Sequence, residues 1–238
     1  MSGNLQIQLE CEHRGITRLC HFTPSRNLPH IIAGMNGILA TSNLENSERQ
    51  VFNATDLKRL DGHKGHICCS IEYPNGWYFS TARSQEAIFK DWIILLIKRD
   101  YLWKVGTRFC PRNASAGYGS YIASGIEGFR LLYQDSITGA GNRTIQRSTT
   151  HLPSCPTDNQ AEVLIPNRVK IEDITGIVVR DAKQAQNERC RLRLLGLEVN
   201  LNFYVAPTFY REDALSRAIR CGRRPEEKLF HDGDRHGR

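Results

Sequence analysis

The hydrophobic residues of the chain fall in short runs separated by polar segments, a pattern typical of a sheet built from short strands. Strands are predicted at residues 16–23, 92–98, 160–166, 174–180 and 197–207. A Pro-Asn-Gly sequence at 74–76 interrupts the apolar stretch 66–83, which we predict as two strands joined by a turn.

The helical segments are short and lie between these strands. One helix is expected to begin near Pro29, because proline is favoured in a first helical turn. Further helices are predicted at 85–91, at 181–193, at 212–222 and after a Gly-rich stretch within 114–134. Two long polar segments, 41–66 and 135–159, are expected to be loops that carry function.

The length and composition are those of a single soluble globular domain. The chain has 238 residues, of which 40% are hydrophobic and 24% are charged. We predict one domain over 1–238, with an α+β core at about 15–206 and a helical, mixed-charge tail at 207–238. The longest apolar run is too short to span a membrane and no leader opens the chain, so a cytoplasmic protein is expected.

Cysteine spacing, net charge and the lack of two common motifs limit the kinds of metal site, partner and nucleotide site that we expect. Eight cysteines without a Cys-x-x-Cys pair favour free, mostly buried thiols over disulfides or a zinc site. A net charge of +7 favours an anionic partner, and nucleic acid is the first candidate. Neither GxGxxG nor GxxxxGK[ST] occurs, so a bound nucleotide is not expected in a Rossmann or P-loop site.

One carboxylate stands out, because Glu162 lies at the start of a strand that is otherwise apolar. Either it is a surface acid on an edge strand, or the strand holds its charge beneath a loop, where it stabilises positive charge on a sugar. His21, at the end of a predicted strand and followed by Thr23, offers polar groups for a ligand. Arg59 lies beside Asp61 in the first long loop and is suited to point into a cleft.

Four stretches together resemble the DarT family, toxin DNA ADP-ribosyltransferases of bacterial toxin–antitoxin systems. They read HFT…NLPHII…GIL, RLDG, WYFSTAR and NQAEVLIP…ITGIVV. The resemblance implies an ADP-ribosyltransferase-like split mixed β-sheet with flanking helices and two long functional loops. It also implies that NAD⁺ is the substrate, that no metal is needed, and that ADP-ribose is joined to a base of single-stranded DNA. The segment SIEYPNGWYFSTAR departs from the more basic stretch of thymidine-modifying members, so thymine and guanine both stay open.

Carried over residue by residue, the resemblance assigns Glu162 to the carboxylate that faces the ribose as nicotinamide leaves. The residues that it implies for NAD⁺ are His21, Phe22, Thr23, His30, Ile38 and Arg59. Arg59 is also implied in deprotonating the acceptor base. The residues expected to contact single-stranded DNA are Trp77, Tyr78, Arg83, Arg143 and Arg147.

A macrodomain antitoxin that removes ADP-ribose is the protein partner that the resemblance implies. Two alternatives stay open: an ADP-ribosyltransferase that acts on RNA or protein, and a nucleic-acid-binding module without catalysis. The Gly-rich stretch FCPRNASAGYGSYIASG either approaches a phosphate chain or merely permits tight packing.

Overall fold

The structure is a computed structural model, and it describes residues 3–33, 36–44, 60–139, 141, 143–198 and 200–231. The strands of its main sheet are β1 (Arg18–Pro24), β3 (His66–Ile71), β4 (Trp92–Lys98), β5 (Arg108–Cys110), β6 (Ala123–Ser124), β9 (Glu162–Pro166), β11 (Ile174–Val179), β12 (Asn202–Val205) and β13 (Lys228–Leu229). Within the described residues this sheet has nine strands in the order β13-β12-β11-β4-β1-β3-β9-β5-β6. The β11–β12 pair is parallel and the pairs on either side are antiparallel, so the sheet is mixed.

The main sheet is split between β1 and β3. These two strands pair at Leu19↔Ile71 and Cys20↔Ser70, whereas β1 pairs with β4 along its whole length. One half of the sheet therefore holds β13, β12, β11, β4 and β1, and the other holds β3, β9, β5 and β6. The split mixed sheet expected from the sequence is confirmed.

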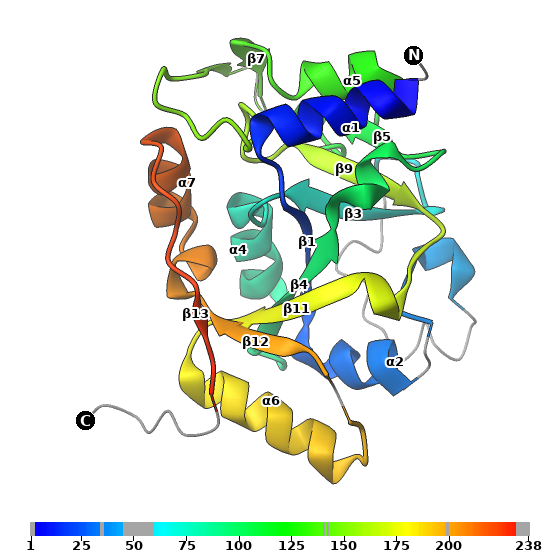
Figure 1. The fold of residues 1–238 in the computed structure, drawn as a ribbon, viewed down its shortest axis with the longest axis vertical. Helices are drawn as coiled ribbons and strands as arrows, with labels where there is room; N and C mark the ends of the chain where they lie inside the picture. The colour runs from blue at the N-terminus through cyan, green and yellow to red at the C-terminus, as the bar shows by residue number, and fades with distance from the viewer. Residues whose placement is uncertain are drawn as a thin grey trace.

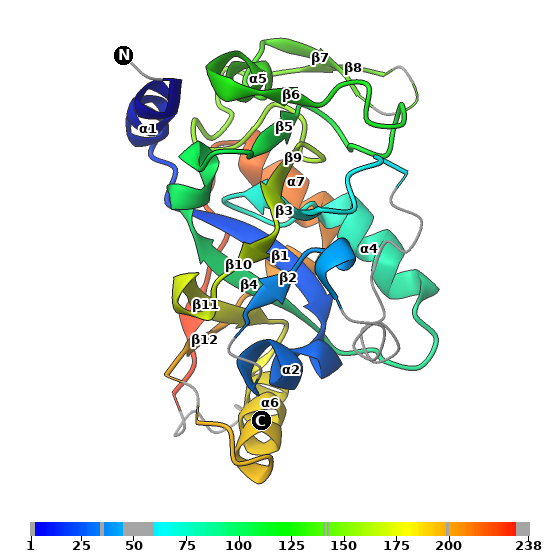
Figure 2. The same ribbon diagram turned by 90° about the vertical axis from the view of Figure 1, so that its right-hand side faces the viewer.

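Helices cover both faces of the sheet, as Figures 1 and 2 show. They are α1 (Gly3–Arg14), α2 (Leu28–Ala33), α4 (Gly76–Gln85), α5 (Gly125–Leu131), α6 (Ala182–Leu194) and α7 (Glu212–Arg220). Buried residues of α1, α2, α5 and α6 pack in the larger hydrophobic cluster, with side chains from one face of the strands. Buried residues of α4, α7 and the 3-10 helix η6 (Pro207–Tyr210) pack in a second cluster, with the alternate strand positions. The result is a three-layer α+β fold.

The prediction of a second strand after the Pro-Asn-Gly turn is wrong, because this aromatic stretch forms helix α4. Glu72 has a left-handed backbone, with φ of 63°, and it takes the chain out of β3. The side chain of Asn75 then caps the helix by accepting a hydrogen bond from the Tyr78 amide at 3.1 Å. Phe79 and Ala82, three residues apart, are buried on one face, which satisfies helical rather than strand periodicity.

Three other elements differ from the prediction. The helix expected at 85–91 does not form, because α4 ends at Gln85 and residues 86–91 form an irregular segment with a bend before β4. The N-terminal segment, predicted only as a polar start, is helix α1, which buries Ile7 and Cys11 on one face. The second long loop contains a hairpin of β7 (Ser136–Thr138) and β8 (Thr144–Gln146).

The segment predicted as a tail packs closely on the core. Strand β13 pairs with β12 and forms the edge of the sheet, and the Arg18 guanidinium donates to both carboxylate oxygens of Glu227, at 2.6 and 2.7 Å. Phe230 is buried in the larger hydrophobic cluster. The C-terminal segment therefore covers one edge of the sheet, where unpaired strand groups would otherwise be exposed.

The cysteines are free thiols, as predicted, and most of them are buried. Burial raises the pKa of the Cys20 thiol to about 12, so this side chain acts as a small hydrophobic group in the core. Among the helices that the structure describes, none is both long and apolar enough to cross a membrane.

Candidate active site

Glu162 is the first residue of β9, a strand that lies between β3 and β5 inside the sheet. The residue is 6% exposed. It stands opposite Cys110 of β5 and is followed by the buried Val163, Leu164 and Ile165. The alternative of a surface acid on an edge strand is therefore excluded. The strand holds a carboxylate at a fixed place near the interior, where desolvation makes its charge interact more strongly than in water.

Both oxygens of the Glu162 carboxylate are held by the segment that follows β5, residues 111–122, which we call the clamp loop. The Asn113 side-chain amide donates to Oε1 at 3.3 Å, and the Ala114 backbone amide donates to Oε2 at 3.1 Å. The Asn113 amide is fixed in turn, because its oxygen accepts from the Ser115 backbone amide at 3.0 Å.

Asn113→Ala is expected to lower kcat roughly tenfold, because a hydrogen bond to a charged group contributes about 1.5 kcal/mol and a tenfold rate change corresponds to about 1.4 kcal/mol. The KM for NAD⁺ is expected to change less than kcat, since Asn113 orients a carboxylate and is not itself placed against NAD⁺. Steady-state kinetics measure both quantities. Asn187→Ala, on the exposed face of α6, is the matched control. An Asn113→Ala enzyme with wild-type kcat contradicts the positioning role.

His21 lies at the point where the two halves of the sheet separate. The preceding residue, Cys20, pairs with Ser70 of β3, and the next residue, His21, pairs with Leu95 of β4. The His21 ring crosses the gap, with Nδ1 at 2.8 Å from the Cys68 carbonyl oxygen. The side chain is half-buried, so the split places a polar ring at an accessible position between the halves.

Thr23 and Phe22 have local packing partners. The Thr23 hydroxyl oxygen is buried and accepts a hydrogen bond from the Asn27 side-chain amide at 2.8 Å. The Phe22 ring lies 4.7 Å from the Phe79 ring and 5.8 Å from the Tyr78 ring, between ring centroids. Phe22 thus joins β1 to helix α4, while the polar neighbours in the strand stand on its other face.

The remaining residues predicted to bind NAD⁺ differ in their exposure to solvent, and one of them is not described by the structure. His30 is exposed on α2, and Ile38 is buried in β2 (Ile38–Leu39), which pairs with β10 (Arg168–Val169). Arg59 lies outside the described residues. The structure does describe Asp61, two residues further along, which is buried and whose carboxylate accepts from the His63 amide at 3.0 Å.

The residues of α4 that were predicted to contact DNA have different environments. Trp77 is 44% exposed in the first turn, and Tyr78 is half-buried. Arg83 donates to the Tyr210 carbonyl oxygen at 2.8 Å, and its guanidinium lies over the Phe79 ring at 4.7 Å from the centroid. Burial lowers the pKa of the Arg83 guanidinium from its ordinary value. Arg83 is thus a structural link between α4 and η6.

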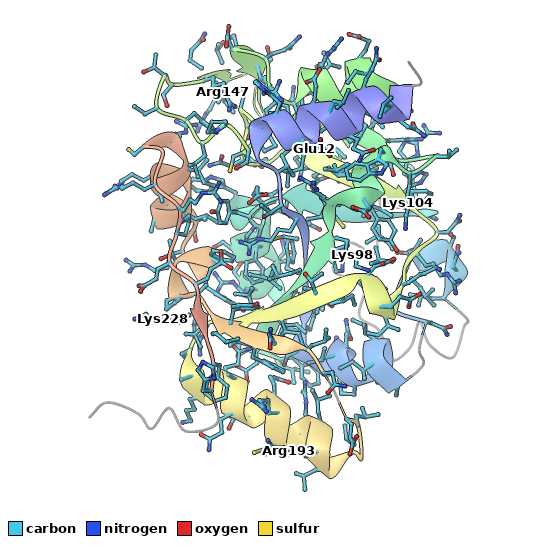
Figure 3. The ribbon with its side chains drawn as sticks, viewed as in Figure 1. Glu12, Lys98, Lys104, Arg147, Arg193 and Lys228 are labelled. Atoms are coloured by element: carbon cyan, nitrogen blue, oxygen red, sulfur yellow. The ribbon has the colours of Figure 1, made fainter. Side chains whose placement is uncertain are left out.

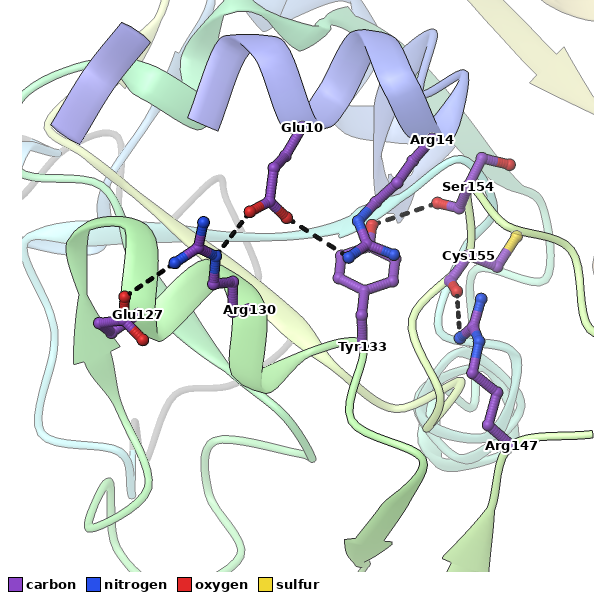
Figure 4. A network of polar contacts seen from close by, with 8 residues as sticks. All are labelled: Glu10, Arg14, Glu127, Arg130, Tyr133, Arg147, Ser154 and Cys155. Atoms are coloured by element: carbon purple, nitrogen blue, oxygen red, sulfur yellow. Dashed lines mark hydrogen bonds and ion pairs between the residues drawn. The ribbon is translucent and has the colours of Figure 1, made fainter. Parts of the chain in front are cut away.

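Arg143 and Arg147 flank strand β8 and have opposite environments. Arg143 is exposed. The Arg147 guanidinium donates to the carbonyl oxygens of Leu152 and Cys155, both at 3.0 Å, and to the hydroxyl of Thr157 at 3.2 Å. Figure 4 shows this side chain against Cys155, close to the network of Arg14 and Tyr133. Arg147 therefore organises the loop that leads to Glu162, whereas Arg143 faces solvent.

The basic side chains labelled in Figure 3 come from separate elements, including Lys98 in β4, Arg193 in α6 and Lys228 in β13. The net charge of +7 is thus not confined to one element. Among the described residues, no group of three His, Cys, Asp or Glu side chains is placed to hold a metal ion.

A family comparison decides which enzymes this arrangement belongs to. The sequence profile described as "ssDNA thymidine ADP-ribosyltransferase, DarT" matches residues 20–211. The chain belongs to the DarT family. As a DarT, it is a transferase that places ADP-ribose on single-stranded DNA, and the resemblance and enzyme class expected from the sequence are confirmed. No curated protein matches the chain in a sequence comparison.

Solved DarT structures have the same fold. Thermus sp. 2.9 DarT in complex with NAD⁺ is 16% identical, with a TM-score of 0.56 over 82% of this chain and 97% of that one. The same protein in complex with ADP-ribosylated ssDNA is 14% identical, with a TM-score of 0.54 and the same coverage. Thermosipho africanus DarTG in complex with ADP-ribose is 16% identical, with a TM-score of 0.56. The match covers 82% of this chain but 51% of the DarTG chain, so this DarT spans about half the length of that relative.

The sequence singled out Glu162 as a candidate residue but did not predict the clamp loop that holds it. The sequence left the Gly-rich stretch undecided between phosphate binding and tight packing. Gly117 and Gly119 are tightly packed in the structure, and amides of Asn113 and Ala114 bind the Glu162 carboxylate. The one available signal was an asparagine with small residues after a strand, which is common in loops of many kinds.

Proposed function

We propose that this DarT transfers ADP-ribose from NAD⁺ to a base of single-stranded DNA and that Glu162 is the carboxylate facing C1 of the nicotinamide ribose. The observation that carries the assignment is the anchoring of this side chain. It is buried at the start of an internal strand, and hydrogen bonds hold both of its oxygens. Such pre-organisation is what an electrostatic catalyst needs, because its charge does not reorient during the reaction.

The proposed reaction replaces one bond to C1 with another. The bond from C1 to the nicotinamide nitrogen breaks, and its electron pair leaves with nicotinamide, which departs as a neutral molecule. Positive charge develops on the ribose, as in glycoside hydrolysis, and the Glu162 carboxylate stabilises it more in the transition state than in bound NAD⁺. A nitrogen of the acceptor base forms the new bond to C1 and then loses its proton.

The roles proposed for the NAD⁺ contacts follow their places in the fold. His21 and Thr23 line the nicotinamide and ribose, supported by the position of the His21 ring where the sheet divides. Phe22 supports this strand from the other face by packing on α4. His30 and Ile38 lie on the elements that follow β1 and close over NAD⁺, and Arg59 contacts its phosphates and assists deprotonation of the base.

The DNA contacts proposed for this site are the exposed members of the predicted set. Trp77 offers an exposed aromatic face with Tyr78 beside it, and the exposed guanidinium of Arg143 is suited to a phosphate. Arg83 and Arg147 are engaged with carbonyl oxygens of the protein, so we propose that they shape the DNA-binding side of the molecule from within.

The proposal predicts that purified protein adds one ADP-ribose to single-stranded DNA when NAD⁺ is present. Four oligonucleotides, each enriched in one base, are incubated with the enzyme and analysed by intact mass spectrometry. We expect a shift of one ADP-ribose on the oligonucleotide rich in thymine or in guanine and none on those lacking both. Labelled NAD⁺ offered with RNA and with protein is the parallel experiment. Incorporation there and not in DNA would favour the alternative acceptor class.

The proposal also includes a macrodomain antitoxin as the partner of this DarT. The support is the length of the DarTG chain from Thermosipho africanus, which this chain covers by 51%. A macrodomain hydrolase that acts on this lesion is expected to return the modified oligonucleotide to its original mass. A modification that resists every macrodomain hydrolase encoded beside the toxin gene would count against this pairing.

A further inference from the structure

The clamp loop contacts Glu162 and also Asp61, a described residue that follows Arg59 by two positions in the chain. Its N-terminal part binds Glu162 through Ala114. Its C-terminal part lies against Asp61, since a Cβ on Gly119 would be 2.5 Å from the Asp61 carbonyl oxygen. Figure 2 shows the green segment between β5 and β6 beside the cyan segment that leads into β3. The loop therefore lies between Glu162 and the segment that follows Arg59.

Tyr118 is a solvent-exposed residue at the turn of the clamp loop. It is 79% exposed and has a left-handed backbone, with φ of 53°. Gly117 and Gly119 on either side also have positive φ, of 93° and 80°. A tyrosine in this conformation costs free energy that an asparagine or glycine would largely avoid. Local packing does not explain the residue, because most of its surface is in solvent.

The backbone of Tyr118 is tied to the Glu162 carboxylate by two successive hydrogen bonds. The amide of Gly119, the next residue, donates to the Ala114 carbonyl oxygen at 3.0 Å. The Ala114 amide donates to Glu162 Oε2 at 3.1 Å. A change in the position of the loop would thus move the tyrosine and the carboxylate together.

A second aromatic ring of the loop is fixed in place. The Arg112 guanidinium lies over the Tyr121 ring, 4.6 Å from its centroid, and Arg112 is 5% exposed. The other contact is with Gly117, where a Cβ would be 2.8 Å from the Tyr121 ring. Tyr121 is still 44% exposed. The loop contains no acidic residue from 111 to 122, so it presents two aromatic rings beside a cation without repelling phosphate.

We propose that Tyr118 is the stacking surface for the unpaired acceptor base, with Tyr121 as the fixed support beside it. The inference rests on the proposed function, because it names the side chain that holds the DNA base next to Glu162. An acceptor base must leave its stack to reach C1 of the ribose, and an aromatic ring replaces part of the stacking that is lost. A flat ring accepts any base, so Tyr118 sets affinity, and the choice of base lies with other groups.

The test compares Tyr118→Ala, Tyr118→Gly and Tyr118→Phe with the wild type. Initial rates are measured against the concentration of a single-stranded oligonucleotide that the wild type modifies, at saturating NAD⁺. We expect KM for the oligonucleotide to rise roughly tenfold for Tyr118→Ala and Tyr118→Gly, because stacking on one aromatic ring contributes a factor of this order. Tyr118→Phe keeps the ring and is expected to stay within about twofold of the wild type.

Tyr118→Gly separates stacking from folding. Glycine relieves the left-handed backbone, so its Tm is expected to equal or exceed that of the wild type while its KM for DNA rises. A purely structural role predicts the two quantities to worsen together. Val105→Ala is the control, because Val105 is 87% exposed in the turn before β5 and is not placed in the site.

The outcomes distinguish this inference from the function on which it rests. If the wild type modifies DNA and all three variants have wild-type KM for the oligonucleotide, the stacking role is wrong and the proposed function stands. If Tyr118→Phe is as impaired as Tyr118→Ala, the hydroxyl rather than the ring matters, which also overturns the inference. If the wild type modifies no DNA, both fall together.

Discussion

Replacement of Glu162 by glutamine is expected to lower kcat for ADP-ribose transfer about a thousandfold. Glutamine keeps the shape of the side chain and removes its negative charge, so the positive charge on the ribose loses its nearest counter-charge in a poorly solvated site. The KM for NAD⁺ should change much less than kcat, since the charge develops only as nicotinamide leaves. Steady-state release of nicotinamide in the presence of a single-stranded oligonucleotide measures both quantities.

Glu162→Gln also has a predictable structural cost. One end of the new amide is a donor, and it must face either the Asn113 side-chain amide or the Ala114 backbone amide, which are donors themselves. We expect a loss of about 1 kcal/mol in the free energy of unfolding, far too little to explain a thousandfold loss of rate.

Glu72→Gln is the matched control for this experiment. Glu72 is another buried glutamate, at 1% exposure, and its carboxylate accepts from the backbone and hydroxyl groups of Thr17. Its replacement is expected to lower stability, while the folded fraction keeps a kcat near that of the wild type. A Glu162→Gln enzyme that transfers ADP-ribose at the wild-type rate would end the assignment of this residue to the reaction.

Arg147→Met is expected to lower the free energy of unfolding by about 3 kcal/mol. Methionine keeps much of the apolar stem but removes the donors that hold Leu152, Cys155 and Thr157, all of them buried. Buried acceptors left without partners cost about 1–3 kcal/mol each, partly offset by relaxation of the loop. For a domain of this size the loss corresponds to a fall in Tm of roughly 6–12 °C, which calorimetry or thermal unfolding by circular dichroism measures.

Arg143→Met is the matched variant, because both arginines flank strand β8, and Arg143 is exposed whereas Arg147 donates to buried carbonyl groups. Arg143→Met is expected to leave Tm within about 1 °C of the wild type, as exposed substitutions usually do. It should reduce the salt dependence of DNA binding by about one phosphate contact, measured as the slope of log Kd against log salt. The reverse result, with Arg147→Met stable but less salt-dependent, would make Arg147 the phosphate contact instead.

The sequence alone was enough to predict the strands that form the core and to single out Glu162 as a candidate functional residue. Residues 92–97 and 177–179 are apolar at consecutive positions, and both stretches lie in interior strands of the sheet. A glutamate beside an apolar run is unusual, because burying a charge is costly. The sequence was therefore enough to identify Glu162 as a candidate functional residue. The resemblance to the DarT family could also be recognised from the sequence, because the motifs that carry it are short stretches of consecutive residues.

Tertiary structure alone decided the neighbours of these residues. Asn113 and Glu162 are 49 residues apart in the chain, and their hydrogen bond depends on β5 pairing with β9 in one register. Helix α4 forms where a strand was predicted, and its Phe79 ring packs against the rings of Phe22 and Tyr210, which come from distant parts of the chain. Arg143 and Arg147 look alike in the sequence, yet Arg147 donates to buried carbonyl groups while Arg143 is exposed. Local patterns specify which residues are buried and in what element, whereas hydrogen-bond partners come from segments that the sequence does not place side by side.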